Sequence, residues 1–113
     1  MKIDITKRHD VNIIRLEGDF ISEVDQEKLR TKVRALVEEG DDRLVLNLKK
    51  VKHINSCGLG SLVCILTTLR KANGDLRLTG TGKYVKQLLQ ITHLDGVIPT
   101  STSEEKALRE LRT

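Results

Sequence analysis

Hydrophobic and polar positions divide the first forty residues into two strands and a helix. Residues 3–6 and 11–16 are rich in β-branched and apolar side chains, which predicts two short strands joined by a polar turn. Gly18 is expected to end the second strand. Ser22, with an acidic residue three positions later, forms a capping box that predicts a helix to about residue 39. The apolar stripe of this helix comprises Val24, Leu29, Val33, Leu36 and Val37.

The middle of the chain contains the clearest strand, residues 43–48, whose apolar run is typical of a strand buried on both faces. Residues 49–55 are expected to form a basic loop with Val51 and Ile54 turned inward. A second helix is expected from Ser56 to about residue 72. Its apolar stripe comprises Leu59, Leu62, Val63, Leu66 and Leu69.

The rest of the chain repeats the alternation of strand and helix. Residues 75–79 predict a strand, residues 83–91 a helix, residues 97–98 a short final strand, and residues 103–111 a terminal helix with an acidic start. The predicted order is therefore β-β-α-β-α-β-α-β-α. Single helices between strands imply parallel pairing, and the opening hairpin adds an antiparallel pair. We expect one α/β domain over residues 1–113, built as a mixed β-sheet with helices.

Composition narrows the classes of ligand. Aromatic residues make up only 2% of the chain, namely Phe20 and Tyr84. Base-stacking platforms and aromatic cages need exposed rings, so the sequence disfavours both. The net charge is +4, but residues 43–93 contain nine basic residues and one acidic residue, a net charge of +8. This stretch is either a solvated face or a basic docking surface. Nucleic-acid binding is the weaker alternative, because no recognisable nucleic-acid-binding motif accompanies the charge.

The cysteines and the hydropathy of the chain indicate the cellular compartment in which the protein works. Cys57 and Cys64 lie seven positions apart in the second predicted helix, so they share a face but stand about 10.5 Å apart along its axis. That distance is too long for a disulfide, and we expect small, buried, reduced thiols. The N-terminus shows no secretory signal, and the longest uncharged run is too short to span a membrane. The sequence therefore predicts a cytoplasmic protein that has no membrane partner.

No catalytic or metal-binding pattern stands out. None of His9, His53 and His93 has a second ligand at metal-binding spacing, and no nucleophile elbow occurs. The glycine pair at residues 80–83 ends in a lysine but lacks the upstream glycine of a phosphate-binding loop, which favours a tight turn. We predict neither enzyme activity nor a cofactor or metal.

The segment of chemical interest begins at Ser56, at the start of the second predicted helix. The simplest interpretation is an N-cap, worth about 1 kcal/mol. Gly58 and Gly60, however, each cost about 1 kcal/mol of helix propensity against alanine, which indicates close approach to the backbone. Lysines also precede the segment, and a helix N-terminus favours a phosphate group.

Residues 56–60, Ser-Cys-Gly-Leu-Gly, follow a buried strand and precede an apolar helix, and in this the sequence resembles the anti-sigma-factor antagonists, the single-domain members of the STAS family. Gly18, residues 88–94 and the acidic start of the last helix extend the resemblance over most of the chain. The resemblance implies a partner switch in transcription regulation. The unphosphorylated protein would bind an anti-sigma factor that is also a serine kinase, and so free the sigma factor. The kinase would phosphorylate Ser56, and a serine phosphatase would reset it.

The resemblance also implies a set of partner-binding residues around the phosphorylated serine. These are Asp19, Ile21, Ser22, Asn55, Cys57, Gly58, Leu59, Gly60 and Ser61. Two of them depart from the family pattern. Asn55 stands where an aspartate usually precedes the serine, and Ile21 stands where the family usually has an acid three residues after Gly18. An alternative function that keeps the fold is a STAS subunit that does not switch, within a larger signalling or transport assembly.

Overall fold

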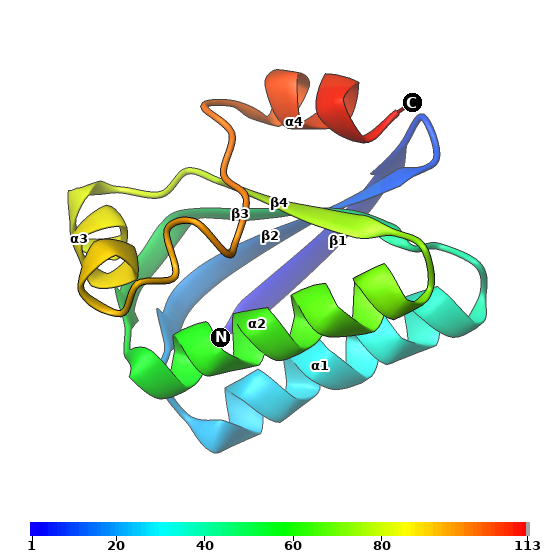
Figure 1. Ribbon diagram of the computed structural model, residues 1–113. Helices are drawn as coiled ribbons and strands as arrows, with labels where there is room; N and C mark the ends of the chain where they lie inside the picture. The colour runs from blue at the N-terminus through cyan, green and yellow to red at the C-terminus, as the bar shows by residue number, and fades with distance from the viewer. Residues whose placement is uncertain (113) are drawn as a thin grey trace.

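The computed structural model describes residues 1–112 as a four-stranded sheet with helices on both faces (Figure 1). The strands are β1 (Lys2–Arg8), β2 (Val11–Phe20), β3 (Arg43–Ile54) and β4 (Asp75–Thr79), and they lie side by side in that order. The helices are α1 (Glu23–Glu38), α2 (Ser56–Lys71), α3 (Lys83–Ile91) and α4 (Glu104–Leu111).

The sheet is mixed, as the sequence predicts. β1 and β2 are antiparallel, and the turn between them consists of His9 and Asp10, which adopt φ angles of 51° and 64°. Two successive left-handed residues match the right-handed twist of the flanking strands and make a tight hairpin. β2, β3 and β4 are parallel, because α1 and α2 cross over between them.

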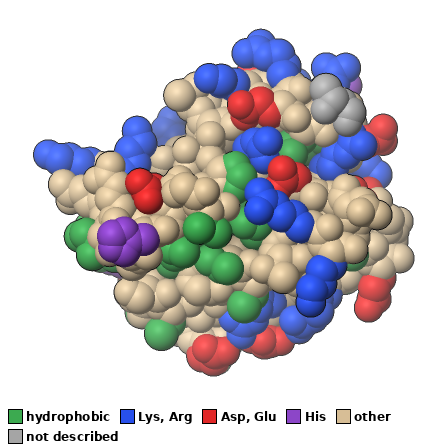
Figure 2. All heavy atoms as spheres, viewed as in Figure 1, with side chains coloured by type: hydrophobic (Ala, Val, Ile, Leu, Met, Phe, Trp, Pro, Cys, Tyr) green, Lys and Arg blue, Asp and Glu red, His purple; other side chains and the backbone are tan. Residues whose placement is uncertain are grey.

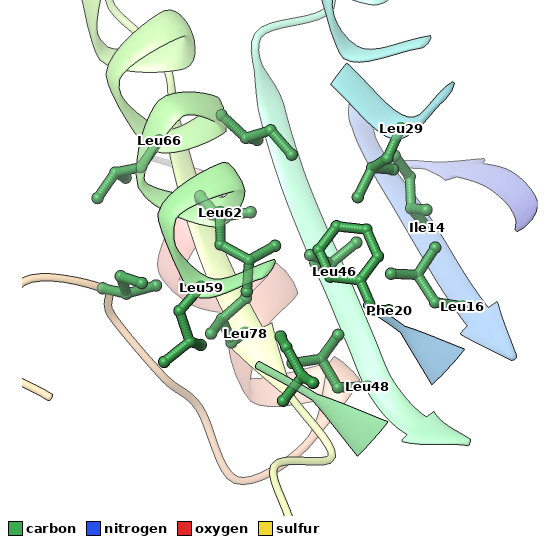
Figure 3. Packing of buried hydrophobic residues seen from close by; sticks show 14 of the residues in the cluster. Ile14, Leu16, Phe20, Leu29, Leu46, Leu48, Leu59, Leu62, Leu66 and Leu78 are labelled. Atoms are coloured by element: carbon green, nitrogen blue, oxygen red, sulfur yellow. The ribbon is translucent and has the colours of Figure 1, made fainter. Parts of the chain in front are cut away.

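The two faces of the sheet carry separate apolar clusters. α1, α2 and α3 pack with the larger one, and in Figure 3 Phe20 and Leu46 lie between Leu29 of α1 and the leucines of α2. α4 covers the opposite face, where Val11, Ile13 and Val45 meet Ala107, Leu108 and Leu111. Neighbouring residues of a strand point to opposite faces, so the apolar run at the start of β3 is buried on both sides, which confirms that prediction.

Two strand boundaries predicted from sequence are wrong. β3 continues to Ile54, so most of the expected basic loop is strand, although Val51 and Ile54 do turn inward. β2 runs past Gly18 to Phe20, and Gly18, at φ 112°, marks an irregularity in the register with β3 rather than the end of a strand. Each extension exists because the other strand supplies its hydrogen-bonding partners, and a short window of sequence does not contain that partner.

The expected final strand at residues 97–98 is also not formed. The Val97 and Ile98 amides donate back to the Leu94 carbonyl in a turn. Pairing with β4 is confined to one bridge at Thr100, where the Leu78 amide donates to the Pro99 carbonyl and the Ser101 amide donates to the Leu78 carbonyl. Pro99 has no amide hydrogen to extend the ladder.

Val24 is a further difference. The sequence places it on the buried stripe of α1, yet it is 78% exposed. Five positions of helix separate Val24 from Leu29, a rotation of about 500°, so their side chains point about 140° apart. The stripe begins at Leu29 and Val33, which are buried.

Candidate functional site

The N-terminus of α2 lies where the carboxyl ends of β2 and β3 meet. Asn55 is its N-cap, because the Asn55 Oδ1 accepts a hydrogen bond of 2.8 Å from the Gly58 amide. This corrects the simple interpretation of Ser56 as the cap. Ser56 is the first helical residue, its side chain is exposed, and its hydroxyl takes part in none of the side-chain hydrogen bonds within residues 1–112.

Gly58 and Gly60 serve different purposes. A Cβ at Gly58 would lie 2.6 Å from the Phe20 carbonyl oxygen and 2.8 Å from a side-chain carbon of Ile54. The close approach expected from sequence is therefore made here by the end of β2, inside the chain. Gly60 is exposed, and a Cβ there would meet nothing within 4 Å. It leaves a stretch of bare helix backbone on the surface.

The exposed surface of the first turns of α2 consists of small groups. Ser56, Cys57 and Gly60 all face outward. The predicted burial of Cys57 and Cys64 is wrong, since both thiols are exposed. Cys57 stands two positions, or about 200°, from the buried Leu59, and therefore points away from the core.

Three residues expected to contact a partner are buried instead. Gly58 packs on β2, and Leu59 is 0% exposed within the main apolar cluster. The Ser61 hydroxyl donates to the Gln26 Oε1 at 2.9 Å and accepts from the Arg30 Nη1 at 2.6 Å. The bare backbone at Gly58 and the side chains of Leu59 and Ser61 hold α2 against the rest of the fold, and all three residues are buried.

The exposed Asp19 near the end of β2 and the exposed loop after β2 lie at the same end of the sheet. Asp19 pairs with His53 at the end of β3, at 2.9 Å between Oδ1 and Nδ1. Ile21 is 43% exposed, and the Ser22 hydroxyl accepts from the Asp25 amide, which confirms the predicted cap of α1. Ser56 and this loop therefore belong to one end of the molecule.

Two residues that sequence reasoning missed fix this arrangement. The buried Gln26 donates from Nε2 to the Ile21 carbonyl at 2.9 Å and accepts from Ser61, so it ties the loop after β2 to α2. The Tyr84 hydroxyl donates to the Ile54 carbonyl at 3.3 Å and holds α3 against the end of β3. No sequence signal marks Gln26, because a polar residue on an amphipathic helix normally faces water.

The local charge is mixed. The first turn of α2 carries no acidic residue. Lys49, Lys50 and Lys52 of β3 line a hollow of about 540 Å³, but Glu17 and Asp19 line it too. Over the face seen in Figure 2, acidic side chains stand among the basic ones. The basic stretch of the sequence is thus interrupted by acids from other parts of the chain.

Within residues 1–112, no three or more His, Cys, Asp or Glu side chains gather as a metal-binding group. Over the same range, none of the helices combines the length and the apolar character that crossing a membrane requires.

The sequence of this chain is similar to those of known proteins. A family model described as STAS domain matches residues 2–107. The anti-sigma-B factor antagonist of Bacillus subtilis is 35% identical over 77 residues, which cover 68% of this chain and 70% of that protein. The anti-sigma F factor antagonist of Paenibacillus polymyxa is 23% identical over 111 residues, or 98% of this chain and 95% of that protein.

The fold is also that of a solved structure. The phosphorylated form of SpoIIAA from Bacillus, described as a cell fate determinant, superposes with a TM-score of 0.75 at 18% identity, covering 98% of this chain and all of that one. Its unphosphorylated form, described as an anti-sigma factor antagonist, gives a TM-score of 0.76 with 98% of each chain covered. At this identity the likeness concerns the fold.

Proposed function

The chain belongs to the STAS domain family, and we propose that it is an anti-sigma-factor antagonist that exchanges partners according to whether Ser56 is phosphorylated. Both of the relatives above are named anti-sigma factor antagonists, and the structurally similar SpoIIAA has been solved both with and without phosphate, which supports the proposal. In this proposal the chain itself binds and performs no catalysis, and it works in the cytoplasm.

The observation that carries the proposal is the exposure of Ser56 at the start of α2. A kinase can reach its hydroxyl, since no side-chain bond within residues 1–112 occupies it. Phosphorylation adds about −1.5 to −2 charges at neutral pH. The N-terminus of a helix stabilises such a group, and the first turn of α2 has no acidic residue to repel it. The modification therefore changes the surface and leaves the fold intact.

The binding surface in this proposal consists of Ser56, Cys57 and Gly60, with Asp19, Ile21 and Ser22 beside them. Small side chains and bare backbone let a partner approach closely, so a phosphate group at the centre separates the two surfaces. A hundredfold loss of affinity requires only about 2.7 kcal/mol. A doubly charged group that must lose its water without a partner supplies that much.

The partner in this proposal is an anti-sigma factor with serine kinase activity, and a serine phosphatase restores the binding form. Asn55 fits the role despite replacing the usual acid, because its Oδ1 caps α2 as a carboxylate would. Ile21 presents an apolar contact where the family pattern has a charge, and this difference favours a distinct choice of partner.

The test is phosphate transfer from the anti-sigma kinase of the host, followed by intact-mass spectrometry. We expect one phosphate on the parent chain, none on Ser56→Ala, and one on Ser103→Ala, which removes a serine from the start of a different helix. Ser56→Ala should still bind the kinase, and Ser56→Glu should bind about a hundredfold more weakly. Equal binding by the parent, Ser56→Ala and Ser56→Glu would instead support a STAS subunit that does not switch.

A further inference from the structure

A second polar hollow, whose lining does not include Ser56, lies between the end of β4, the beginning of α3 and the approach to α4. It encloses about 230 Å³. Its lining comes from three segments distant in sequence: Gly80 and Thr81 after β4, Lys86 of α3, and residues 100–102 with Lys106 of α4. In Figure 1 the connection from α3 to α4 passes beside β4, which is how these segments meet.

The hollow is built by backbone contacts that fix its walls. The Ser101 amide donates to the Leu78 carbonyl at 2.8 Å, which attaches residues 100–102 to β4. Gly80 has a φ of +66°, and a Cβ there would lie 2.6 Å from the Lys49 amide nitrogen. Only glycine fits this turn, so the chain after β4 bends sharply and leaves open space above it.

The groups around the hollow are suited to an anion. Two lysines line it, and none of the lining residues within positions 1–112 is acidic. The amides of Thr81, Thr100 and Thr102 donate to no acceptor within residues 1–112, and the hydroxyls of these three threonines are free over the same range. Ser101 differs, since its hydroxyl is bound to the Glu110 carboxylate.

The helix that begins here adds to the positive potential. Gly82, the N-cap of α3, has no side chain to accept from the amides of the first turn. The first turn of α3 also contains no acidic residue. The partial positive charge of its N-terminus is therefore uncompensated next to Lys86. At the end of β4, next to Gly80 in the sequence, the Thr79 hydroxyl is buried and has no hydrogen-bond partner within residues 1–112.

We propose that this hollow binds a small doubly charged oxyanion, either inorganic phosphate or the phosphate group of a small metabolite. Its volume lies below the roughly 300–1,000 Å³ typical of pockets for larger ligands, which favours the anion itself with few attached atoms. Lys86 and Lys106 supply the charge, and the threonine amides and hydroxyls supply directed hydrogen bonds. The glycine-containing segment 80–83, interpreted from sequence as a tight turn, thus forms one wall of a binding site.

The test is a titration of the uniformly ¹⁵N-labelled full chain with inorganic phosphate, with ionic strength held constant by sodium chloride. We expect saturable amide shifts at Gly80, Thr81 and residues 100–102. The double variant Lys86→Ala/Lys106→Ala should bind at least about tenfold more weakly, since it loses two charge-assisted contacts. Lys28→Ala/Lys32→Ala, which removes the same charge from the outer surface of α1, should bind like the parent.

Three outcomes would overturn the proposal. Chloride alone could reproduce the shifts, which would make them a response to ionic strength. The Lys86→Ala/Lys106→Ala variant, with its other resonances unchanged, could bind as tightly as the parent. The saturable shifts could also cluster at residues 56–58, which would place the anion at the N-terminus of α2. The titration needs no kinase, so its result is independent of the proposed switch.

Discussion

The N-termini of α2 and α4 differ in how the partial positive charge at the start of the helix is compensated. Both begin with a polar cap, Asn55 for α2 and Ser103 for α4. The first turn of α4 contains Glu104 and Glu105, whereas the first turn of α2 contains no acid. The potential at α4 is therefore compensated within the chain, while the potential at α2 is left for a group from outside.

The surroundings of the two helix ends strengthen this contrast. The Glu104 carboxylate accepts two hydrogen bonds of 2.9 Å from the Arg15 guanidinium and one of 2.7 Å from the Asn47 amide. The hydrogen bond from Arg15 is the main reason that the pKa of Glu104 is lowered. At α2, Ser56 and Cys57 are exposed. The α4 end is closed and structural, and the α2 end is open, which is the property that a docking surface needs.

The largest effect on stability is expected at the glycine that brings α2 close to β2. Gly58→Ala places a methyl group 2.6 Å from the Phe20 carbonyl oxygen. We expect the free energy of unfolding to fall by about 2 kcal/mol, because overpacking outweighs the gain in helix propensity. Urea unfolding measures it.

Gly60→Ala is the matched control, since open space surrounds that position. It should raise the free energy of unfolding by about 0.5–1 kcal/mol. Equal effects of the two substitutions would show that α2 does not depend on its contact with β2.

The next largest effect is expected at the closed end. Glu104→Gln weakens the contact with Arg15, and the free energy of unfolding at pH 7 should fall by about 1–2 kcal/mol. Because the pKa of Glu104 is lowered from its ordinary value of 4.5, its carboxylate stabilises the fold above that pH. This contribution disappears as the pH falls through the lowered pKa. The difference between parent and variant should shrink between pH 7 and pH 3, and a constant difference would contradict this account.

The cap of α2 should have a smaller effect. Asn55→Ala removes the acceptor of the Gly58 amide and should cost about 1 kcal/mol. Asn55→Asp keeps an oxygen in the same place, so its stability should stay within about 0.5 kcal/mol of the parent. If both variants unfold alike, the cap does not hold the first turn of α2.

The smallest change in stability, and the sharpest separation from function, is expected for Ser56→Asp. A carboxylate in the first turn of α2 should raise the free energy of unfolding by about 0.3–1 kcal/mol, because it compensates the open helix end. If the proposed switch is correct, the same charge should weaken binding to the anti-sigma kinase. Stability and binding therefore move in opposite directions, as measured by urea unfolding and titration calorimetry. Loss of both would show instead that the variant acts through misfolding.

Local sequence was sufficient where an element depends on its own residues. The helix expected at residues 83–91 has those boundaries in the structure, and Ser22 and Ser103 cap α1 and α4. The mixed sheet followed from the alternation of strands and single helices. Sequence was insufficient where an element depends on a distant partner, as in the second half of β3, which exists because β2 lies beside it.

The candidate site shows the same division. The sequence pointed to Ser56, a helix N-terminus and a close approach at Gly58, since serine, glycine and a preceding buried strand are all local features. It did not show that Cys57 faces outward, that Ser61 is bound by Gln26, or that Phe20 is the group that approaches Gly58.

The sequence by itself determined the order of the elements, apart from the expected strand at residues 97–98, many of their boundaries and the serine that opens an apolar helix. Periodicity and caps are properties of a few neighbouring residues, and these fixed the local structure. Only the tertiary structure decided that the N-terminus of α4 is closed by Arg15 while the N-terminus of α2 is left open. It also decided that the turn after β4 lies beside residues 100–102. Those contacts join segments many residues apart, and their geometry follows from how the sheet and helices pack.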